Sequence, residues 1–188
     1  RDPEAQAELA VLEKIQPVLA EGKSARIVEL EDEEELLIKS LGFLTRKPII
    51  YAANVSEDEL AEGNDWVEQV KTLAAAEEAQ VVTISAQVEA ELLELPEDER
   101  NDFLEALGVE EGGLKSLIRA TYDLLGLRTY FTTGPKETRA WTIITGMSAP
   151  QAAGVIHTDF ERGFIRAETV AYKDLVEHGS MNAAKEKG

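Results

Sequence analysis

The first pattern along the chain is a stripe of helical spacing over residues 4–20. It recurs at alternating steps of four and three residues, at Ala5, Leu9, Leu12, Gln16 and Leu19, with Val11, Ile15 and Val18 beside it. This spacing predicts a helix with an apolar face. Two interpretations stay open: an ordinary amphipathic helix, or one arm of a helical hairpin whose other arm has been lost.

Two short, largely apolar runs at residues 49–53 and 80–84 predict buried strands. Continuous runs of this length are typical of strands in a parallel sheet. Between them, Asn64 or Asp65 can cap a helix that carries Trp66, Val70 and Leu73 on one face. Strand, helix and strand in this order form a βαβ unit, so we expect a parallel sheet covered by helices.

The remaining segments alternate between helical and strand patterns. The acidic cluster at residues 31–35 suits the first turn of a helix rather than a metal site. Further helices are expected at residues 87–94, 97–107 and 112–125, the last with Leu114, Leu117, Ile118 and Leu125 on one side.

Beyond residue 126 the pattern changes. Residues 127–133 and 139–145 alternate like two strands around Gly134-Pro135, which predicts an antiparallel hairpin. Ser148 and Gln151 form a capping-box pattern before a helix. Its expected buried face holds Ala149, Ala152, Ala153, Ile156 and Phe160. Residues 164–172 predict one more strand, and we expect Trp141, Phe160 and Phe164 in the core.

Charge divides the chain at the same place. The whole chain of 188 residues has a net charge of −18, which argues against a simple nucleic-acid binder. Residues 127–188 carry 8 basic and 7 acidic side chains, so residues 1–126 hold the remaining 11 and 30. Cysteine is absent, which removes disulfides and thiolate metal sites, and no stretch has the length of a membrane helix. We therefore expect a cytoplasmic protein without a membrane partner, and the ends at Arg1 and Gly188 are expected to be cuts through something longer.

The two junctions between strand and helix hold the candidate chemistry. In open α/β sheets, ligands bind outside the carboxyl ends of the strands. Asn54-Val55-Ser56-Glu57 follows the first predicted strand, and Ser85-Ala86-Gln87 follows the second. Each alone is typical of a turn and a cap. Together, at the same end of adjacent strands, they predict a ligand site.

This pair of loops resembles the base-recognition motifs of P-loop GTPases, an Asn-Lys-x-Asp loop followed by a Ser-Ala loop. Val55 stands in the Lys position and Glu57 in the Asp position, and this Asn-x-x-Glu form resembles the YchF (Obg-like) ATPase family. The later segments 131–134, 139–142, 149–154 and 156–165 resemble the TGS domain of that family.

The resemblance implies an α/β fold in three parts. Residues 1–45 would be a helical coiled-coil arm and return helix, and residues 46–126 the C-terminal part of a P-loop GTPase-type nucleotide domain with a partial parallel sheet. Residues 127–188 would be a truncated TGS domain, an incomplete α+β β-grasp fold. It also implies a monomer that binds ATP, GTP more weakly, and the ribosome or RNA through its TGS and coiled-coil regions.

The chemistry of the loop supports relaxed selectivity. An Asp in the fourth position accepts two hydrogen bonds from guanine, and adenine lacks the 2-amino group that gives one of them. The longer Glu57 places its carboxylate elsewhere, so the advantage of guanine falls. Asn54 can donate to N7 and accept from the adenine 6-amino group, and the backbone amides of Ser85 and Ala86 can close the pocket. These residues, with Val55 and Gln87, are the predicted base-binding site.

No Gly-x-x-x-x-Gly-Lys-Ser/Thr phosphate loop occurs in the 188 residues. We therefore expect this chain alone to hydrolyse nothing, with Mg²⁺ and the catalytic residues belonging to the complete protein. His157 favours a structural hydrogen bond over catalysis, and a separated pair with His178 falls short of a metal site. The alternative is a non-catalytic acidic, ubiquitin-like adaptor that binds protein or RNA. A self-contained enzyme using His157 and Asp159 is disfavoured.

Overall fold

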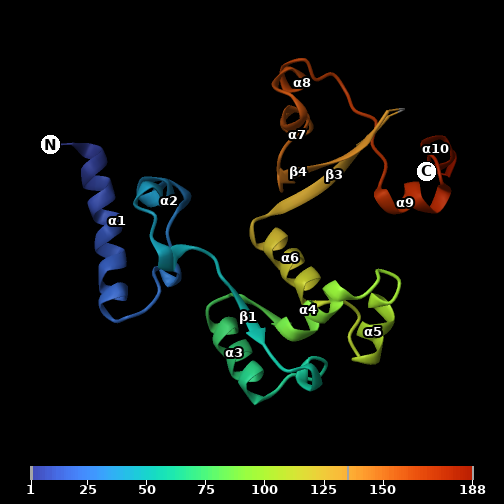
Figure 1. The fold of residues 1–188 in the computed structure, drawn as a ribbon. Coiled ribbons are helices and arrows are strands. Elements are labelled where there is room, and N and C mark those ends of the chain that lie inside the picture. Colours follow the sequence, from blue (N-terminus) through green and yellow to red (C-terminus); the bar gives the residue numbers. More distant parts are fainter. Residues whose placement is uncertain (1, 135, 188) are drawn as a thin grey trace. The chain divides into compact units, whose positions relative to one another are not determined.

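The computed structural model describes residues 2–134 and 136–187, and the chain divides into two compact units, Arg1–Leu125 and Gly126–Gly188 (Figure 1). Both are mixed α/β structures in which the described strands form two-stranded sheets. None of the described helices combines the length and the apolar character needed to cross a membrane.

The first unit begins with a helical arm, a name used here for residues 2–48. Helix α1 (Pro3–Ala20) confirms the predicted helix and starts at Asp2, whose side chain accepts the Glu4 N–H at 3.0 Å. Its buried residues are Val11 and Ile15, which flank the predicted stripe, whereas Leu9 is 55% exposed. Three short 3₁₀ turns and a second helix complete the arm: η1 (Ala25–Ile27), α2 (Asp32–Ile38), η2 (Lys39–Leu41) and η3 (Leu44–Arg46). Helix α2 starts in the acidic cluster with a capping box between Glu31 and Glu34.

The predicted βαβ unit is confirmed. Strands β1 (Ile50–Asn54) and β2 (Gln80–Ile84) pair in parallel, in a register that sets Ile50 against Gln80 and Asn54 against Ile84. Between them, η4 (Glu57–Glu59) precedes α3 (Asp65–Ala76). The Asn64 side chain caps α3 by accepting the Val67 N–H at 2.9 Å.

The buried face of α3 differs from the predicted apolar face. Val67 and Ala74 are buried, whereas Trp66 is 73% and Leu73 51% exposed. Val67 and Ala74 lie two helical turns apart, one position beyond Trp66 and Leu73, so the helix is rotated by one residue. The small Ala74 lets α3 lie close to the sheet, which a large side chain there would prevent.

Three helices follow β2: α4 (Ala86–Glu94), α5 (Arg100–Ala106) and α6 (Gly113–Leu124). Val88, Leu92 and Leu104 form a buried apolar cluster between α4 and α5. In α6 the apolar side is largely uncovered among the described residues, with Leu114 47% and Ile118 51% exposed. Gly113 is buried, and a Cβ there would meet Ile84 Cγ1 at 2.7 Å, so α6 starts in direct contact with the end of β2.

The second unit is built on the predicted hairpin. Strands β3 (Leu127–Thr133) and β4 (Thr138–Ile144) are antiparallel, and the Gly134 N–H donates to the Glu137 carbonyl across the turn at 3.0 Å. Pro135, part of the predicted turn, lies outside the described residues. The Tyr130 hydroxyl donates to the Ala152 carbonyl at 3.0 Å and so ties the next helix to the hairpin.

Four helices follow the hairpin: α7 (Ala149–Ile156), α8 (Thr158–Arg162), α9 (Tyr172–His178) and α10 (Met181–Lys187). The capping box of Ser148 and Gln151 at the start of α7 is confirmed. His157 makes a structural hydrogen bond, as predicted, because its Nδ1 accepts the Asp159 N–H at 3.2 Å and caps α8.

Two predictions for this unit are wrong. The strand predicted at residues 164–172 does not form: residues 164–171 make no ladder with β3 or β4, Ile165 is 91% exposed, and Tyr172 begins α9. The predicted buried face is wrong at two positions, because Phe160 is 53% exposed and Ala149 is exposed as well. The helix that should carry Phe160 ends at Ile156, and the extended backbone of His157 places Phe160 on α8. Trp141 and Phe164 are half-buried.

Candidate functional site

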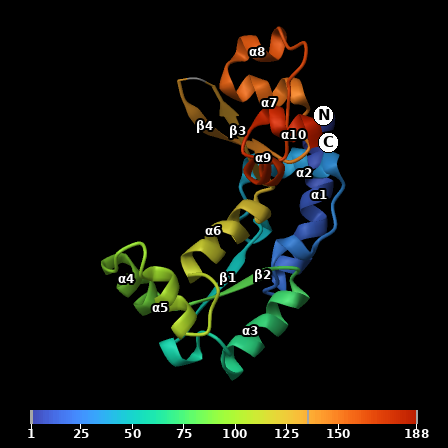
Figure 2. The same cartoon turned by 90° about the vertical axis from the view of Figure 1, so that its right-hand side faces the viewer.

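The two candidate loops leave the sheet at the same edge. Because Asn54 and Ile84 are register partners in parallel strands, the residues that follow them lie next to one another. The ladder continues one step further, since the Val55 N–H donates to the Ile84 carbonyl at 2.9 Å. Figure 2 shows β1 and β2 side by side, with α3 and α6 on either side of the pair.

A side-chain hydrogen bond joins the loops. Asn54 Oδ1 accepts the Ala86 N–H at 3.0 Å, across 32 positions of sequence. The bond fixes the orientation of the carboxamide, so the Nδ2 group is directed away from Ala86 with no partner among the described residues. It also occupies the Ala86 N–H, one of the two amides expected to close a base pocket. Asn54 therefore presents a donor at this edge.

Ser85 and Gln87 support the loop that carries Ala86. The Ser85 side chain is 1% exposed and its Oγ accepts the Val88 N–H at 3.5 Å, which caps α4. Gln87 is exposed and donates to Glu91 one turn along α4 at 3.0 Å. The hydroxyl of Ser85 thus serves the helix start, and the amide of Gln87 is engaged along the helix surface.

The other side of the site is the loop from Val55 to Glu59. Val55 is buried, with 7% exposed, so its side chain belongs to the interior. Glu57 is exposed, and its carboxylate makes no hydrogen bond or ion pair with the residues that the structure describes. A charge at this position is free to meet a ligand.

Glu59 was not among the predicted site residues, although it organises the loop. Its Oε2 accepts from Ser56 Oγ at 2.8 Å and from the Ser56 N–H at 3.3 Å. Hydrogen bonds from the Asn64 side chain and then from Ser56 lower the pKa of the Glu59 carboxyl. The spacing Ser56-x-x-Glu59 is the capping-box signal that could have identified it.

Neither a phosphate loop nor a metal cluster accompanies this site in the described residues. Gly22-Lys23-Ser24 matches the end of the phosphate-loop pattern, but Pro17 stands where the first glycine belongs. The tripeptide lies between α1 and the short 3₁₀ turn η1 instead of opening an α-helix, and Lys23 pairs with Glu21 at 2.7 Å. No group of three or more His, Asp or Glu residues in the described segments could hold a metal ion.

A family model matches the second unit. The model YchF-GTPase_C, described as a protein of unknown function (DUF933), covers residues 127–188.

Curated proteins match the whole chain. The "Ribosome-binding ATPase YchF" of Bacillus subtilis is 52% identical over 190 residues, which is 100% of this chain and 52% of that protein. The protein of the same name from Haemophilus influenzae is 52% identical over 187 residues, 100% of this chain and 51% of that protein. "Obg-like ATPase 1" of Pongo abelii is 45% identical over 161 residues, 84% of this chain and 40% of that protein. The chain thus spans about half the length of the curated relatives that it matches.

A solved structure is also similar. The structure of the Schizosaccharomyces pombe YchF GTPase matches with a TM-score of 0.83 and 35% identity, over 97% of this chain and 49% of that one. This agreement and the matches to curated proteins confirm the predicted resemblance to the YchF family.

Proposed function

This chain belongs to the family of YchF and Obg-like ATPases, and from that premise we propose that it carries the base-binding part of an ATP-preferring, ribosome-associated nucleotide hydrolase. The single observation that carries the proposal is the hydrogen bond from the Ala86 N–H to Asn54 Oδ1. It brings two loops from adjacent strands into one site and leaves a side-chain donor at the edge where ligands of open α/β sheets bind.

The donor on Asn54 defines what the site can recognise. Adenine and guanine both present N7 as an acceptor, so a donating Asn54 Nδ2 holds either purine. Discrimination between adenine and guanine then depends on Glu57, whose carboxylate has no partner among the described residues. The Ala86 N–H could contribute only if its hydrogen bond to Asn54 opened. A carboxylate that no longer pairs with both guanine donors removes about 1–3 kcal/mol of discrimination, so we expect ATP to be preferred modestly.

The parts of the proposed protein have separate roles. Residues 1–45 would form a helical coiled-coil arm, residues 46–126 part of a P-loop-type nucleotide domain with a parallel sheet, and residues 127–188 a TGS domain. Hydrolysis and Mg²⁺ binding require a phosphate loop, which the 188 residues lack, so the chain alone is inactive. We propose a cytoplasmic monomer that contacts the ribosome or RNA through the coiled-coil arm of residues 1–45 and the TGS domain.

Nucleotide titration tests the base site. The chain is joined to the part of the Bacillus subtilis relative that it does not match, and ATP and GTP are titrated by calorimetry. Asn54→Asp keeps the acceptor for Ala86 but removes the donor, so both affinities should fall by about tenfold or more. Asn101→Ala, at an exposed asparagine on α5, is the matched control and should leave both unchanged.

Two outcomes would contradict the proposal. GTP bound at least tenfold more tightly than ATP would remove the adenine preference. Equal nucleotide affinity in Asn54→Asp and in the unsubstituted protein would remove Asn54 from the site. If the joined protein binds no nucleotide at all, the non-catalytic adaptor becomes the better interpretation.

Ribosome contact is tested separately. Co-sedimentation with ribosomal subunits should recover the joined protein, and recovery should fall with salt if phosphate contacts contribute. The net charge of +1 over residues 127–188 means that such contacts need a local basic face. No recovery with either subunit would remove this partner.

A further inference from the structure

The helical arm and the helices that follow β2 have separate apolar clusters. The cluster of the arm holds Val11, Ile15, Ala25 and Ile38 with partly buried neighbours between Leu12 and Phe43. The second cluster lies between α4 and α5, with partly buried neighbours between Leu60 and Val109. Neither cluster includes a residue of β1 or β2, so apolar packing within these clusters does not join the arm to the strand pair. Directed polar contacts are then the means of fixing one on the other.

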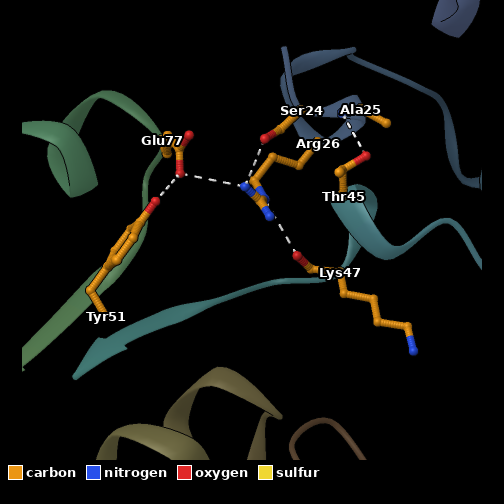
Figure 3. A network of polar contacts seen from close by, with 7 residues as sticks. All are labelled: Ser24, Ala25, Arg26, Thr45, Lys47, Tyr51 and Glu77. Atoms are coloured by element: carbon orange, nitrogen blue, oxygen red, sulfur yellow. Dashed lines mark hydrogen bonds and ion pairs between the residues drawn. The ribbon is translucent and has the colours of Figure 1, made fainter. Parts of the chain in front are cut away.

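Arg26 makes such a contact. Its Nη1 lies 3.4 Å from Glu77 Oε2, at the end of α3, and donates to Ser24 Oγ at 3.2 Å (Figure 3). Its Nε donates to the Lys47 carbonyl, just before β1, at 3.3 Å. The side chains of Arg26 and Glu77 are 15% and 21% exposed, so solvent screens this ion pair less than it screens a surface pair.

Tyr51 completes the network from the sheet. Its hydroxyl donates to the same Glu77 Oε2 at 2.7 Å, from the second residue of β1 (Figure 3). One carboxylate oxygen therefore receives a hydrogen bond from the arm and another from the strand. The contacts connect residues that are 51 and 26 positions apart in sequence.

The backbone around Arg26 is fixed by further hydrogen bonds. Arg46 Nη1 donates to the carbonyls of Ala25 and Val28 at 2.8 and 3.0 Å, and the Ala25 N–H donates to Thr45 Oγ1 at 3.2 Å. The η1 turn that carries Arg26 is thus fixed within the arm, so a restraint on the Arg26 guanidinium restrains the arm as a body.

We propose that Arg26, Glu77 and Tyr51 form a joint that sets the direction of the helical arm on the strand pair. A planar guanidinium with several fixed donors can define an angle, which a point charge on a flexible stem cannot. The joint lies at the amino ends of β1 and β2, and the candidate base site lies at their carboxyl ends. These three are positioning residues that act on the arm, and the inference does not depend on nucleotide binding.

A distance measurement tests the joint. The chain contains no cysteine, so Glu13→Cys on α1 and Gln69→Cys on α3, both exposed, can be spin-labelled selectively. Pulsed electron paramagnetic resonance on the full chain should give one narrow distribution of distances between the labels. Arg26→Gln and Glu77→Gln should each replace it with a broad distribution, and the reversed pair Arg26→Glu with Glu77→Arg should recover part of the narrow distance.

The control separates direction from stability. Arg119→Gln breaks the ion pair between Arg119 on α6 and Glu111, neither of which belongs to the arm or to α3. This variant should leave the distance between the labels narrow. Thermal melting of every variant reports stability independently. An unchanged distribution in both glutamine variants would overturn the proposal, as would equal broadening in Arg119→Gln. If the glutamine variants do not fold, Tyr51→Phe, which keeps the ring, decides: a broadened distribution supports the joint and an unchanged one overturns it.

Discussion

The contact between Gly113 and Ile84 allows a stringent test of how α6 meets β2. In Gly113→Ala the new Cβ would lie 2.7 Å from Ile84 Cγ1, 2.9 Å from its Cβ and 3.0 Å from its Cα. The first atom can move with a rotamer change, but the Cα belongs to the strand backbone, so β2 or α6 must shift.

The magnitude follows from two opposing terms. Adding a methyl group to a closely packed site costs about 1–3 kcal/mol, and contact with backbone places Gly113 in the upper part of that range. Replacing glycine by alanine in a helix returns up to about 1 kcal/mol. We therefore expect a net loss of about 1–2 kcal/mol in the free energy of unfolding of the first unit.

The neighbouring glycine provides the control. In Gly112→Ser the new Cβ meets Glu89 Oε1 at 3.0 Å, the movable end of a side chain. Gly112 is the N-cap residue of α6, where serine is favourable, so the change should stay within about 0.5 kcal/mol.

Urea unfolding followed by circular dichroism measures both variants. With a slope of about 2 kcal/mol per molar, in the middle of the range for small proteins, Gly113→Ala should lower the midpoint by roughly 0.5–1 M. Because Ile84 immediately precedes Ser85, hydrogen exchange at the Ala86 N–H should also become faster in this variant. Equal midpoints for Gly113→Ala and Gly112→Ser would refute the close contact.

Two further predictions concern charged groups of the first unit. Arg46→Met removes two hydrogen bonds to backbone carbonyls and the pairing with Glu35, so we expect a loss of about 2–3 kcal/mol in urea unfolding at neutral pH. Because the hydrogen bond from Arg46 lowers the pKa of Glu35 below its ordinary 4.5, the stability from this pair is lost as the pH falls through the folded pKa, and the difference from the unsubstituted chain should narrow in acid. The hydrogen bond to Glu77 raises the pKa of Tyr51 above its ordinary 10.0, so its contribution is present below pH 10 and is lost as the pH rises further. The fall in the urea midpoint between pH 8 and a pH above 10 should therefore be smaller in Tyr51→Phe than in the unsubstituted chain. Equal falls in the two proteins would contradict this assignment.

The sequence predicts the βαβ unit and the hairpin because their signals are local. Apolar runs mark β1 and β2, and Asn64 marks the start of α3 through a side-chain cap that spans three residues. The same reasoning places the candidate loops after both strands. It fails at residues 164–171, where alternation alone suggests a strand, because a strand also requires a partner whose presence no local pattern reveals.

The parts that escape prediction depend on distant residues. The bond between Asn54 and Ala86 requires the register of two strands, and the pairing of Arg26 with Glu77 spans 51 positions. The rotation of α3 that exposes Trp66 depends on how closely Ala74 fits the sheet, which periodicity does not specify. Sequence therefore identifies the residues of the base site more readily than the hydrogen bonds that orient them.

The three capping boxes found in the described residues, at α2, η4 and α7, imply that acid affects the two units unequally. Hydrogen bonding to Lys14 and then to the Glu31 backbone lowers the pKa of Glu34, and bonds from Asn64 and Ser56 lower that of Glu59. Both carboxylates therefore lose their contribution as the pH falls through their folded pKa values. The box at α7 uses the amide of Gln151, which does not titrate. Acidification should thus loosen the start of α2 and the turn beside Asn54 while the start of α7 stays intact, so the candidate base site would belong to the more acid-labile of the two units.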